Sequence, residues 1–395
     1  MTTTRPTHVE AVIIGGGYAG LLAAAVISRS GYDVLVLAGQ GCLDDPTQAP
    51  TAPRAGEVLH VGGIHDVNDL VYQAEAALRA RGAHTFPLPG TGTTLQRQHQ
   101  ASSRPWDTRE LLTCSHELLT QVLRERVLAS PGLARETQIW DGAQAVGLIG
   151  DAQVVRGVRL ALEDGTEQEV TADLVVDASG AGSLTPTWLK ALGHHPAAVS
   201  TAGVAGYSAT RVYQAPTASA DISVTTVIDD ARSALLVPVE DGRWLVTQTA
   251  PEPEHFADAG AFEKAGLALA DPLVGELIAT AKPLGEVHIS ATASPRWYRY
   301  ELVRSWPRRF VVLGDAAATL PGHTDGLLAA EAGARALRVA LGQGILHPTL
   351  SRRTQQAVGE EIAGLWPGPD PDQRPGAGLL RQAGVQARRL LRSRQ

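Results

Sequence analysis

The chain has little cysteine and no long apolar run, and both absences limit what it can be. Its 395 residues include only two cysteines, Cys42 and Cys114, which are far apart in the sequence. So few cysteines predict a reducing compartment and no disulfide framework. No apolar run reaches the ~20 residues of a transmembrane helix, and the polar residues 1–10 are unlike a signal peptide. We therefore expect a cytoplasmic protein with no membrane span.

An excess of positive charge and a metal-ligand pattern are also missing. The formal net charge is −7 at pH 7, so nucleic acid is not an expected partner. His60 and His65 have the wrong spacing for a helical metal pair, and we expect no metal site. The composition is that of a globular protein, and the length allows two joined domains. Nothing in the sequence indicates an oligomeric state.

A glycine-rich stretch near the start is the strongest signal in the chain. The apolar run Ala11–Ile14 predicts a buried strand, and a helix-like run follows from Leu21 to Ile27. Between them Gly15, Gly17 and Gly20 have the G-x-G-x-x-G spacing. In a dinucleotide fold these glycines allow a tight turn, a close approach of the backbone to a pyrophosphate, and close packing of helix on strand. The stretch therefore predicts a dinucleotide-binding fold.

The second strand of this fold lacks its usual acidic end. Residues Asp33–Leu37 predict that strand, which typically ends in an Asp or Glu that accepts hydrogen bonds from the adenosine ribose. Ala38 and Gly39 stand there instead, and no acid follows before Asp44. We expect weaker binding of the ribose as a result.

Apolar spacing and turn residues predict the remaining elements. An irregular loop is expected over Cys42–Gly63, a helix over Asp66–Gly82, and a loop or hairpin between His84 and Trp106. A long amphipathic helix is expected over Thr108–Ala129 with Asp107 as its N-cap. Further strands are expected at Ala145–Ile149, Val154–Leu162, Ala172–Gly180 and Arg309–Ala316, and a small-residue-rich helix at Gly326–Leu341.

The middle of the chain has a different pattern of predicted secondary structure. Short β-type segments run from Val199 to Thr249, and one helix-like stretch follows over Ala259–Ala281. We expect a second domain built on a mostly antiparallel sheet. A proline-rich linker, Trp366–Gly376, and a basic helix-like tail, Leu379–Arg394, end the chain.

Taken together, these pieces resemble the aromatic-hydroxylase-type (group A) FAD-dependent monooxygenases, especially actinobacterial enzymes that oxidise or epoxidise natural-product precursors. The resemblance covers roughly Glu10–Leu341. Its most specific stretches are Ala172–Gly193, which contains Asp177-Ala178-Ser179-Gly180, and Arg304–Ala316, which ends in Leu313-Gly314-Asp315-Ala316. Ser115 with Leu118 and Leu119 matches more loosely, as does the Arg54–His60 loop.

The resemblance implies an α/β fold with a Rossmann-type FAD-binding domain and a second, mostly antiparallel substrate domain. The domains would be residues 1–198 plus 295–345, residues 199–294, and a C-terminal linker and tail at 346–395. It implies that Asp315 holds the ribitol hydroxyls and that the helix start at Gly326 and Leu327 faces the flavin. The cofactor-binding residues implied are Gly15, Gly17, Gly20, Arg54, Gly314, Asp315, Gly326 and Leu327. NAD(P)H is implied as the reductant and an apolar small molecule as the substrate.

The chain departs from the family pattern around the cofactor. Ala38 stands where the family has the acid that binds the ribose. Arginines of the family are replaced by Leu59, His116 and Ala181. The family's Pro-x-x-Gly-Gln-Gly-type loop is replaced by Pro321-Gly322-His323-Thr324-Asp325-Gly326. His323 and Asp325 are therefore candidate catalytic residues, with an ordinary polar surface loop as the alternative. Asp315 could alternatively be only a helix N-cap. Arg54 and Glu57 could alternatively be solvated loop charges without a binding role.

Three functions follow from these features. The first is a flavin monooxygenase of secondary metabolism that hydroxylates or epoxidises an apolar precursor, such as a polyketide. The second is a redox-neutral cyclase or isomerase on the same fold, in which the flavin is structural or lost and His323 or Asp325 does acid–base work. The third is a non-catalytic binder of a hydrophobic small molecule.

Overall fold

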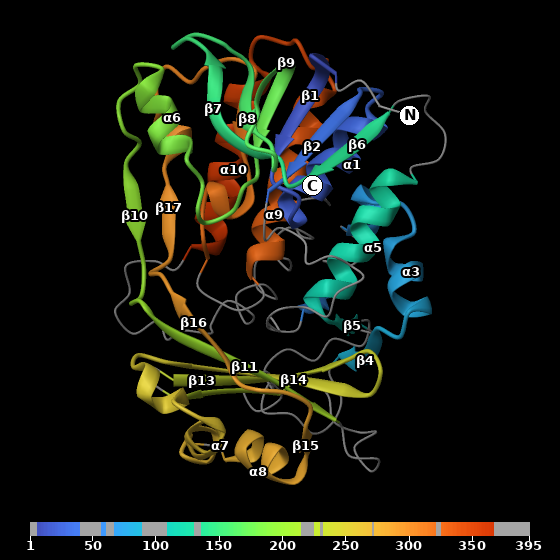
Figure 1. The fold of residues 1–395 in the computed structure, drawn as a ribbon, viewed down its shortest axis with the longest axis vertical. Coiled ribbons are helices and arrows are strands. Elements are labelled where there is room, and N and C mark those ends of the chain that lie inside the picture. The colour runs from blue at the N-terminus through green and yellow to red at the C-terminus, as the bar shows by residue number, and fades with distance from the viewer. Residues whose placement is uncertain are drawn as a thin grey trace, which may run out of the picture.

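The computed structural model describes residues 6–39, 57–60, 67–88, 109–129, 136–214, 225–229, 232–270, 272–320 and 325–366. Within these ranges a large mixed sheet lies at one end of the molecule and an antiparallel sheet at the other (Figure 1). Helices cover the large sheet, and α7 and α8 lie on the side of the antiparallel sheet that is turned away from it. The predicted α/β class with a Rossmann-type half is confirmed.

The large sheet has seven strands, in the order β6-β2-β1-β9-β8-β7 with β18 against β9. Its parallel strands are β6 (Thr137–Asp141), β2 (Val34–Ala38), β1 (His8–Ile14), β9 (Glu167–Asp177) and β18 (Phe310–Val312). β8 (Val155–Ala161) and β7 (Gln144–Gly150) continue it in antiparallel fashion. β1 and β2 are near-continuous runs of Val, Ile, Leu and Ala because parallel strands are covered on both faces.

Helices from distant parts of the chain share a hydrophobic core with this sheet. They are α1 (Tyr18–Arg29), α3 (Ala74–Ala80), α5 (His116–Leu128), α6 (Thr185–Ala191), α9 (Asp325–Leu341) and α10 (Leu350–Leu365). α1 and α9 pack against each other, and α10 packs on α9 and β18. α10 was not predicted; it is held to β18 by hydrogen bonds from Gln355 to the Val312 carbonyl oxygen and from the Phe310 N–H to Ser351.

The antiparallel sheet has its own hydrophobic core. Its strands are β11 (Gly206–Gln214), β12 (Thr225–Asp229), β13 (Arg232–Val239), β14 (Arg243–Ala250), β15 (Lys282–Pro283) and β16 (His288–Thr292). One face packs on η1 (Pro253–Phe256), α7 (Ala259–Leu267) and α8 (Leu273–Thr280) through Phe256, Phe262 and Ile278. The other face carries Leu235, Val237 and Leu245, which are also buried.

Two small sheets lie between the large ones. β10 (Val199–Thr201) pairs with β17 (Arg296–Tyr298), where the chain enters and leaves the antiparallel sheet. β3 (Glu57–His60), β5 (Arg109–Cys114) and β4 (His84–Leu88) form a three-stranded sheet with β5 in the middle. Two short 3-10 turns, η2 (Tyr300–Leu302) and η3 (Gly314–Ala316), flank β18.

Several predicted elements are wrong in detail. The helix predicted over Thr108–Ala129 is a strand, β5, followed by the helix α5, whose N-cap is Ser115. The Ser115 hydroxyl accepts a hydrogen bond from the Leu118 N–H and so fixes the helix start. The Cys42–Gly63 loop contains β3. The helix predicted over Ala259–Ala281 is two helices, and a helix covers only part of Asp66–Gly82.

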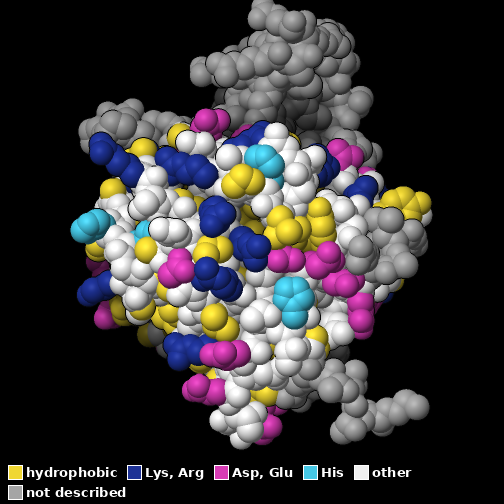
Figure 2. Space-filling model, turned by 90° about the horizontal axis from the view of Figure 1, so that it is seen from above, with side chains coloured by type: hydrophobic (Ala, Val, Ile, Leu, Met, Phe, Trp, Pro, Cys, Tyr) yellow, Lys and Arg dark blue, Asp and Glu magenta, His cyan; other side chains and the backbone are white. Residues whose placement is uncertain are grey.

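Within the described ranges, no helix is long and apolar enough to cross a membrane. Seen from above, the face at the large-sheet end carries basic, acidic and scattered hydrophobic side chains interspersed with one another (Figure 2). The linker and the basic tail predicted over Trp366–Gly376 and Leu379–Arg394 lie outside the described residues, apart from Trp366.

Candidate functional site

The glycine-rich turn has three glycines in three different environments. Gly15 has a φ of +110°, and a Cβ there would lie 2.3 Å from the Ala178 carbonyl oxygen. A Cβ on Gly20 would lie 1.9 Å from the Gly15 carbonyl oxygen. A Cβ on Gly17 would meet no atom within 4 Å. Gly15 and Gly20 are therefore required for packing, whereas Gly17 borders open space.

Gly17 is also the N-cap of α1, the helix that faces this open space. Among the described residues no side chain caps the helix, and its first turn has no acidic residue. The N–H groups at a helix start carry a partial positive charge and bind phosphate when nothing else occupies them. The turn therefore fits a dinucleotide diphosphate, with Gly17 at the closest approach.

A second predicted segment lies against this turn. Gly314 has a φ of +59°, and a Cβ there would lie 2.6 Å from the Ala19 Cβ in the first turn of α1. Asp315 follows in η3, and its Oδ1 would lie 3.6 Å from a Cβ on Gly326. Gly326 is in the first turn of α9. The structure thus brings together the glycine turn, Asp315 and the start of α9, which are far apart in the sequence.

The remaining predicted site residues differ in how they are placed. Leu327 is buried in the core at 5% exposure, so only its backbone is available at the start of α9. Asp325 is the first residue of α9, but the structure does not describe its side chain. Arg54 and His323 lie outside the described residues. The catalytic roles of His323 and Asp325 and the binding role of Arg54 stay predictions.

The rings of Tyr18 and His116 form a pair beside the glycine turn that was not predicted. The Tyr18 hydroxyl and the His116 Nδ1 are 2.6 Å apart, and their ring centroids are 4.7 Å apart. Tyr18 is the first residue of α1 and His116 the first of α5, so the pair joins the starts of two helices. Tyr18 occupies a variable position of the glycine motif, and no pattern in the sequence marked it.

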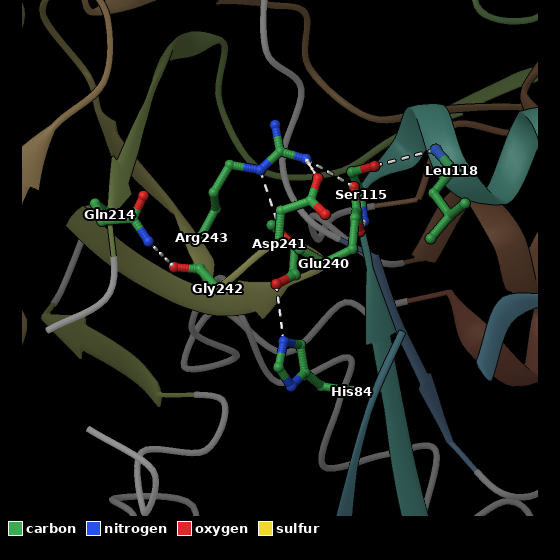
Figure 3. Close-up of polar contacts among 9 residues, drawn as sticks. His84, Ser115, Leu118, Gln214, Glu240, Asp241, Gly242 and Arg243 are labelled. Carbon is green, nitrogen blue, oxygen red and sulfur yellow. Dashed lines mark hydrogen bonds and ion pairs between the residues drawn. The ribbon is translucent and has the colours of Figure 1, made fainter. Parts of the chain in front are cut away.

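The antiparallel sheet is anchored to the start of α5 by a buried carboxylate, Glu240 (Figure 3). Its Oε2 accepts a hydrogen bond of 3.0 Å from the Ser115 N–H, and its Oε1 lies 3.3 Å from the Arg243 guanidinium. Nearby, the His84 Nε2 lies 2.9 Å from the Val239 carbonyl oxygen. The turn between β13 and β14 therefore fixes the sheet against the helix that reaches the glycine turn.

Replacing Glu240 with Ala should destabilise the protein by about 1–3 kcal/mol, because the buried Ser115 N–H loses its acceptor. Asp241→Asn is the control: Asp241 forms an ion pair with the same Arg243 at 3.0 Å, its side chain is 76% exposed, and asparagine also tolerates its φ of +61°. Its loss should cost about 0–1 kcal/mol. Urea unfolding of both variants measures the difference, and equal losses would contradict an anchoring role for Glu240.

The aromatic segment from Arg296 to Tyr300 packs inside the protein. Trp297 and Tyr300 are buried in the main core, and the Arg299 guanidinium carbon lies 3.9 Å from the Trp297 ring centroid. The Trp297 ring also contacts that of Trp366 at the end of α10. These contacts make the segment a packing element in the described structure.

Two hydroxyl pairs lie on the face of the antiparallel sheet that also carries Leu235, Val237 and Leu245. Thr210 and Thr247 are 2.9 Å apart across β11 and β14, and Ser233 and Thr249 are 2.7 Å apart across β13 and β14. This face is turned toward the large sheet (Figure 1). It therefore joins an apolar area to a row of hydroxyl groups.

The glycine turn, the uncapped α1 and the Gly314–Asp315 segment define a dinucleotide-binding flavoprotein class. The model of a family described as "FAD binding domain" matches residues 8–321, so the chain belongs to that family. It is similar to Protein Rv3254 of Mycobacterium tuberculosis, with 29% identity over 366 residues that cover 84% of this chain and 73% of the relative.

Two further likenesses refine the class. The chain is 33% identical over 178 residues to 6-methylpretetramide 4-monooxygenase of Streptomyces rimosus, covering 44% of this chain and 38% of that enzyme. The fold is similar to that of the flavin-dependent brominase Bmp2, with a TM-score of 0.67 and 15% identity over 98% of this chain and 93% of the brominase. The chain thus belongs to the FAD-binding family and is similar to a flavin-type monooxygenase over part of its length.

Proposed function

We propose that the protein binds FAD, takes electrons from NAD(P)H, and hydroxylates or epoxidises an apolar natural-product precursor. The observation that carries the proposal is the uncapped start of α1 beside Gly17, with Asp315 and the start of α9 next to it. The likeness to a Streptomyces monooxygenase supports the reaction type. In this proposal residues 1–198 plus 295–345 hold the cofactor, and residues 199–294 bind the substrate.

Each part of the proposed site has a physical role. The N–H groups of α1 bind the diphosphate, and the Asp315 carboxylate accepts hydrogen bonds from the ribitol hydroxyls. When bound, FAD would supply the redox chemistry, in which NAD(P)H provides two electrons and molecular oxygen gives one atom to the substrate and the other to water. The positive end of α9 near Gly326 would favour negative charge on the reduced ring.

The antiparallel sheet supplies the substrate side in this proposal. Leu235, Val237 and Leu245 are buried on this side of the sheet, so they would form a dry apolar layer behind the substrate. Ser233 and Thr249 are only half-buried, and their pair uses one of its two hydroxyl protons internally, which leaves the other for an acceptor on a ligand. This favours an apolar substrate that carries a few oxygen functions, as many aromatic polyketides do.

Purified protein should be yellow, or become yellow with added FAD, and should oxidise NADPH faster when a suitable substrate is present. We would use 6-methylpretetramide as the first probe, with and without oxygen and with and without bromide. The expected product is one oxygen atom heavier than the probe and forms only with both oxygen and reductant. Mass spectrometry of the product is the measurement.

The other outcomes separate the alternatives. A brominated product would assign the halogenase chemistry suggested by the fold neighbour. Conversion of the probe without oxygen or reductant would indicate a redox-neutral cyclase or isomerase, and His323→Ala or Asp325→Ala should then lower its rate by about two to four decades. A colourless protein that refuses FAD and still binds the probe would indicate a non-catalytic binder.

A further inference from the structure

The acid missing from the end of β2 has a counterpart on the neighbouring strand. β2 and β6 are parallel, and Ala38 is the register partner of Asp141 at the end of β6. The Gly142 N–H donates a 2.7 Å hydrogen bond to the Ala38 carbonyl oxygen, so the two strand ends are held together. Neighbouring strands lie about 4.8 Å apart. A carboxylate therefore stands one strand away from the place where a dinucleotide fold usually has one.

The Asp141 carboxylate is held in position and remains accessible. Arg124 of α5 donates to its Oδ1 at 2.9 Å and to its Oδ2 at 2.6 Å. Such a bidentate pair fixes the plane of the carboxylate. The Asp141 side chain is nevertheless 61% exposed, whereas that of Arg124 is 23% exposed. An ionised carboxylate accepts about four hydrogen bonds, so acceptor sites remain besides the two that Arg124 uses.

The order of the strand ends tells which part of a dinucleotide meets this carboxylate. The carboxyl ends of the parallel strands lie along one edge in the order β6, β2, β1, β9 and β18. Ligands of such sheets bind outside this edge. The diphosphate site at β1 is in the middle, and Asp315, which follows β18, is on one side of it. The adenosine half therefore extends to the other side, over β2 and β6.

We propose that Asp141 replaces the missing acid of β2: it accepts hydrogen bonds from the adenosine ribose of FAD, and Arg124 positions it. The inference rests on the proposed binding of FAD. Ala38 itself is 2% exposed and has no polar side-chain atom, so it offers the ribose no hydrogen bond. Asp141 and Asp315 then flank the diphosphate site, one for each sugar-like part of the cofactor.

The competing explanation is an ordinary surface ion pair that fastens α5 to β6. The chain contains another exposed pair of that kind. Asp151 pairs with Arg156 at 2.9 Å, its side chain is 53% exposed, and it lies beside β7 at the opposite edge of the same sheet. Its Oδ1 also accepts hydrogen bonds from the Gln153 and Val154 N–H groups. Asp151→Ala therefore removes an ion pair and two backbone hydrogen bonds far from the proposed cofactor in sheet order, and it serves as the control.

The test measures dissociation constants for FAD and FMN in the wild type, Asp141→Ala and Asp151→Ala by flavin fluorescence. Asp141→Ala should weaken FAD about ten- to a hundredfold, because hydrogen bonds to a charged group are worth about 1.5–3 kcal/mol. FMN has no adenosine ribose, so its affinity should stay unchanged. Asp151→Ala should change neither affinity, and thermal unfolding should show that both variants fold.

A rescue experiment separates the carboxylate from the ion pair. Ala38→Glu in the Asp141→Ala background returns an acid to the end of β2 and should restore most of the lost FAD affinity. In the wild type the same change should help less, because two adjacent carboxylates repel each other. Arg124→Met breaks the ion pair but keeps the carboxylate and should weaken FAD less than Asp141→Ala does.

Equal FAD affinity in the wild type and Asp141→Ala would overturn the assignment of Asp141 and leave the proposed function standing. Equal losses in Asp141→Ala and Arg124→Met, with no rescue by Ala38→Glu, would assign a purely structural role and also overturn it. A wild type that does not bind FAD, whether it binds FMN or no flavin at all, would overturn both the inference and the proposed function.

Discussion

Gly17→Ala should abolish tight FAD binding while leaving the protein folded. Gly17 has a φ of −78° and a ψ of −172°, which alanine adopts freely, and a Cβ there meets no protein atom within 4 Å. The added methyl group instead occupies the space in front of α1, where the diphosphate would approach. Losing two charge-assisted hydrogen bonds of about 1.5–3 kcal/mol each weakens FAD by about two to four decades. The free energy of unfolding should change by less than about 0.5 kcal/mol.

Gly20→Ala, in contrast, should lower the stability of the folded protein. Its Cβ would lie 1.9 Å from the Gly15 carbonyl oxygen and 2.9 Å from the Gly15 carbonyl carbon. Both atoms belong to the backbone of the turn, so no side-chain rotation relieves the overlap. We expect a destabilisation of about 3 kcal/mol or more, at the upper end of what overpacking costs. FAD binding is then lost because the turn itself is lost.

The two variants are compared by urea unfolding and by flavin titration. Gly364→Ala in α10 is the control, because a Cβ there also meets nothing within 4 Å. It should stabilise the protein by up to about 1 kcal/mol through higher helix propensity and should leave FAD binding unchanged. A Gly17→Ala protein that binds FAD as the wild type does would show that the diphosphate does not lie at this turn.

The glycine turn could be read from the sequence because its determinants are local. A short apolar run, the glycine spacing and the following helix lie within Ala11–Ile27, and each residue type has a steric reason at its position. β1, α1 and β2 accordingly form close to where they were predicted. The predicted neighbours Gly314 and Asp315 also lie beside the turn, but their motif came from a family resemblance and not from local chemistry.

The elements that were missed depend on contacts between distant segments. Arg109–Cys114 has helix-compatible spacing, but it forms the central strand between β3 and β4, and Ser115 then starts α5. Pairing with two neighbouring strands outweighed local propensity there. Asp141 gave no signal either, because its register with Ala38 exists only once β6 lies beside β2. Pairing between strands that are more than a hundred residues apart in sequence is not visible in periodicity.

Replacing Asp177 should cause the largest loss of stability among the polar residues at the ligand edge of the sheet. Asp177 ends β9 and is fully buried. Its carboxylate accepts hydrogen bonds from the Ser179 N–H at 3.0 Å, the Ser179 hydroxyl at 2.6 Å and the Ser183 hydroxyl at 2.6 Å. The Thr185 hydroxyl is a further donor. Burial, together with the negative charge of Asp177, raises the pKa of Tyr300.

Asp177→Ala leaves these donors without an acceptor and should cost about 3–5 kcal/mol. Asp164→Ala is the matched control, because Asp164 also accepts from an N–H and a hydroxyl two residues on, those of Thr166 at 2.9 and 2.5 Å. Asp164 is exposed, so water replaces it and the cost should stay near 1 kcal/mol or below. Urea unfolding of both variants measures the loss in free energy of unfolding. Similar losses would show that burial does not determine how much the Asp177 hydrogen bonds stabilise the protein.

The Asp177 cluster also bears on the cofactor site through Ala178. A Cβ on Gly15 would lie 2.3 Å from the Ala178 carbonyl oxygen, so the glycine turn packs directly against the backbone at the end of β9. Asp177→Ala should therefore weaken FAD binding even under conditions in which most of the variant is folded. Asp177→Asn keeps the shape of the side chain and the Oδ1 acceptor, but it replaces the charged Oδ2 with an NH2 group, to which the Ser183 and Thr185 hydroxyls would have to turn as acceptors. It should therefore restore only part of the lost stability. Full recovery of both stability and FAD affinity in Asp177→Asn would show that the shape of the side chain, and not its charge, holds the end of β9 in place.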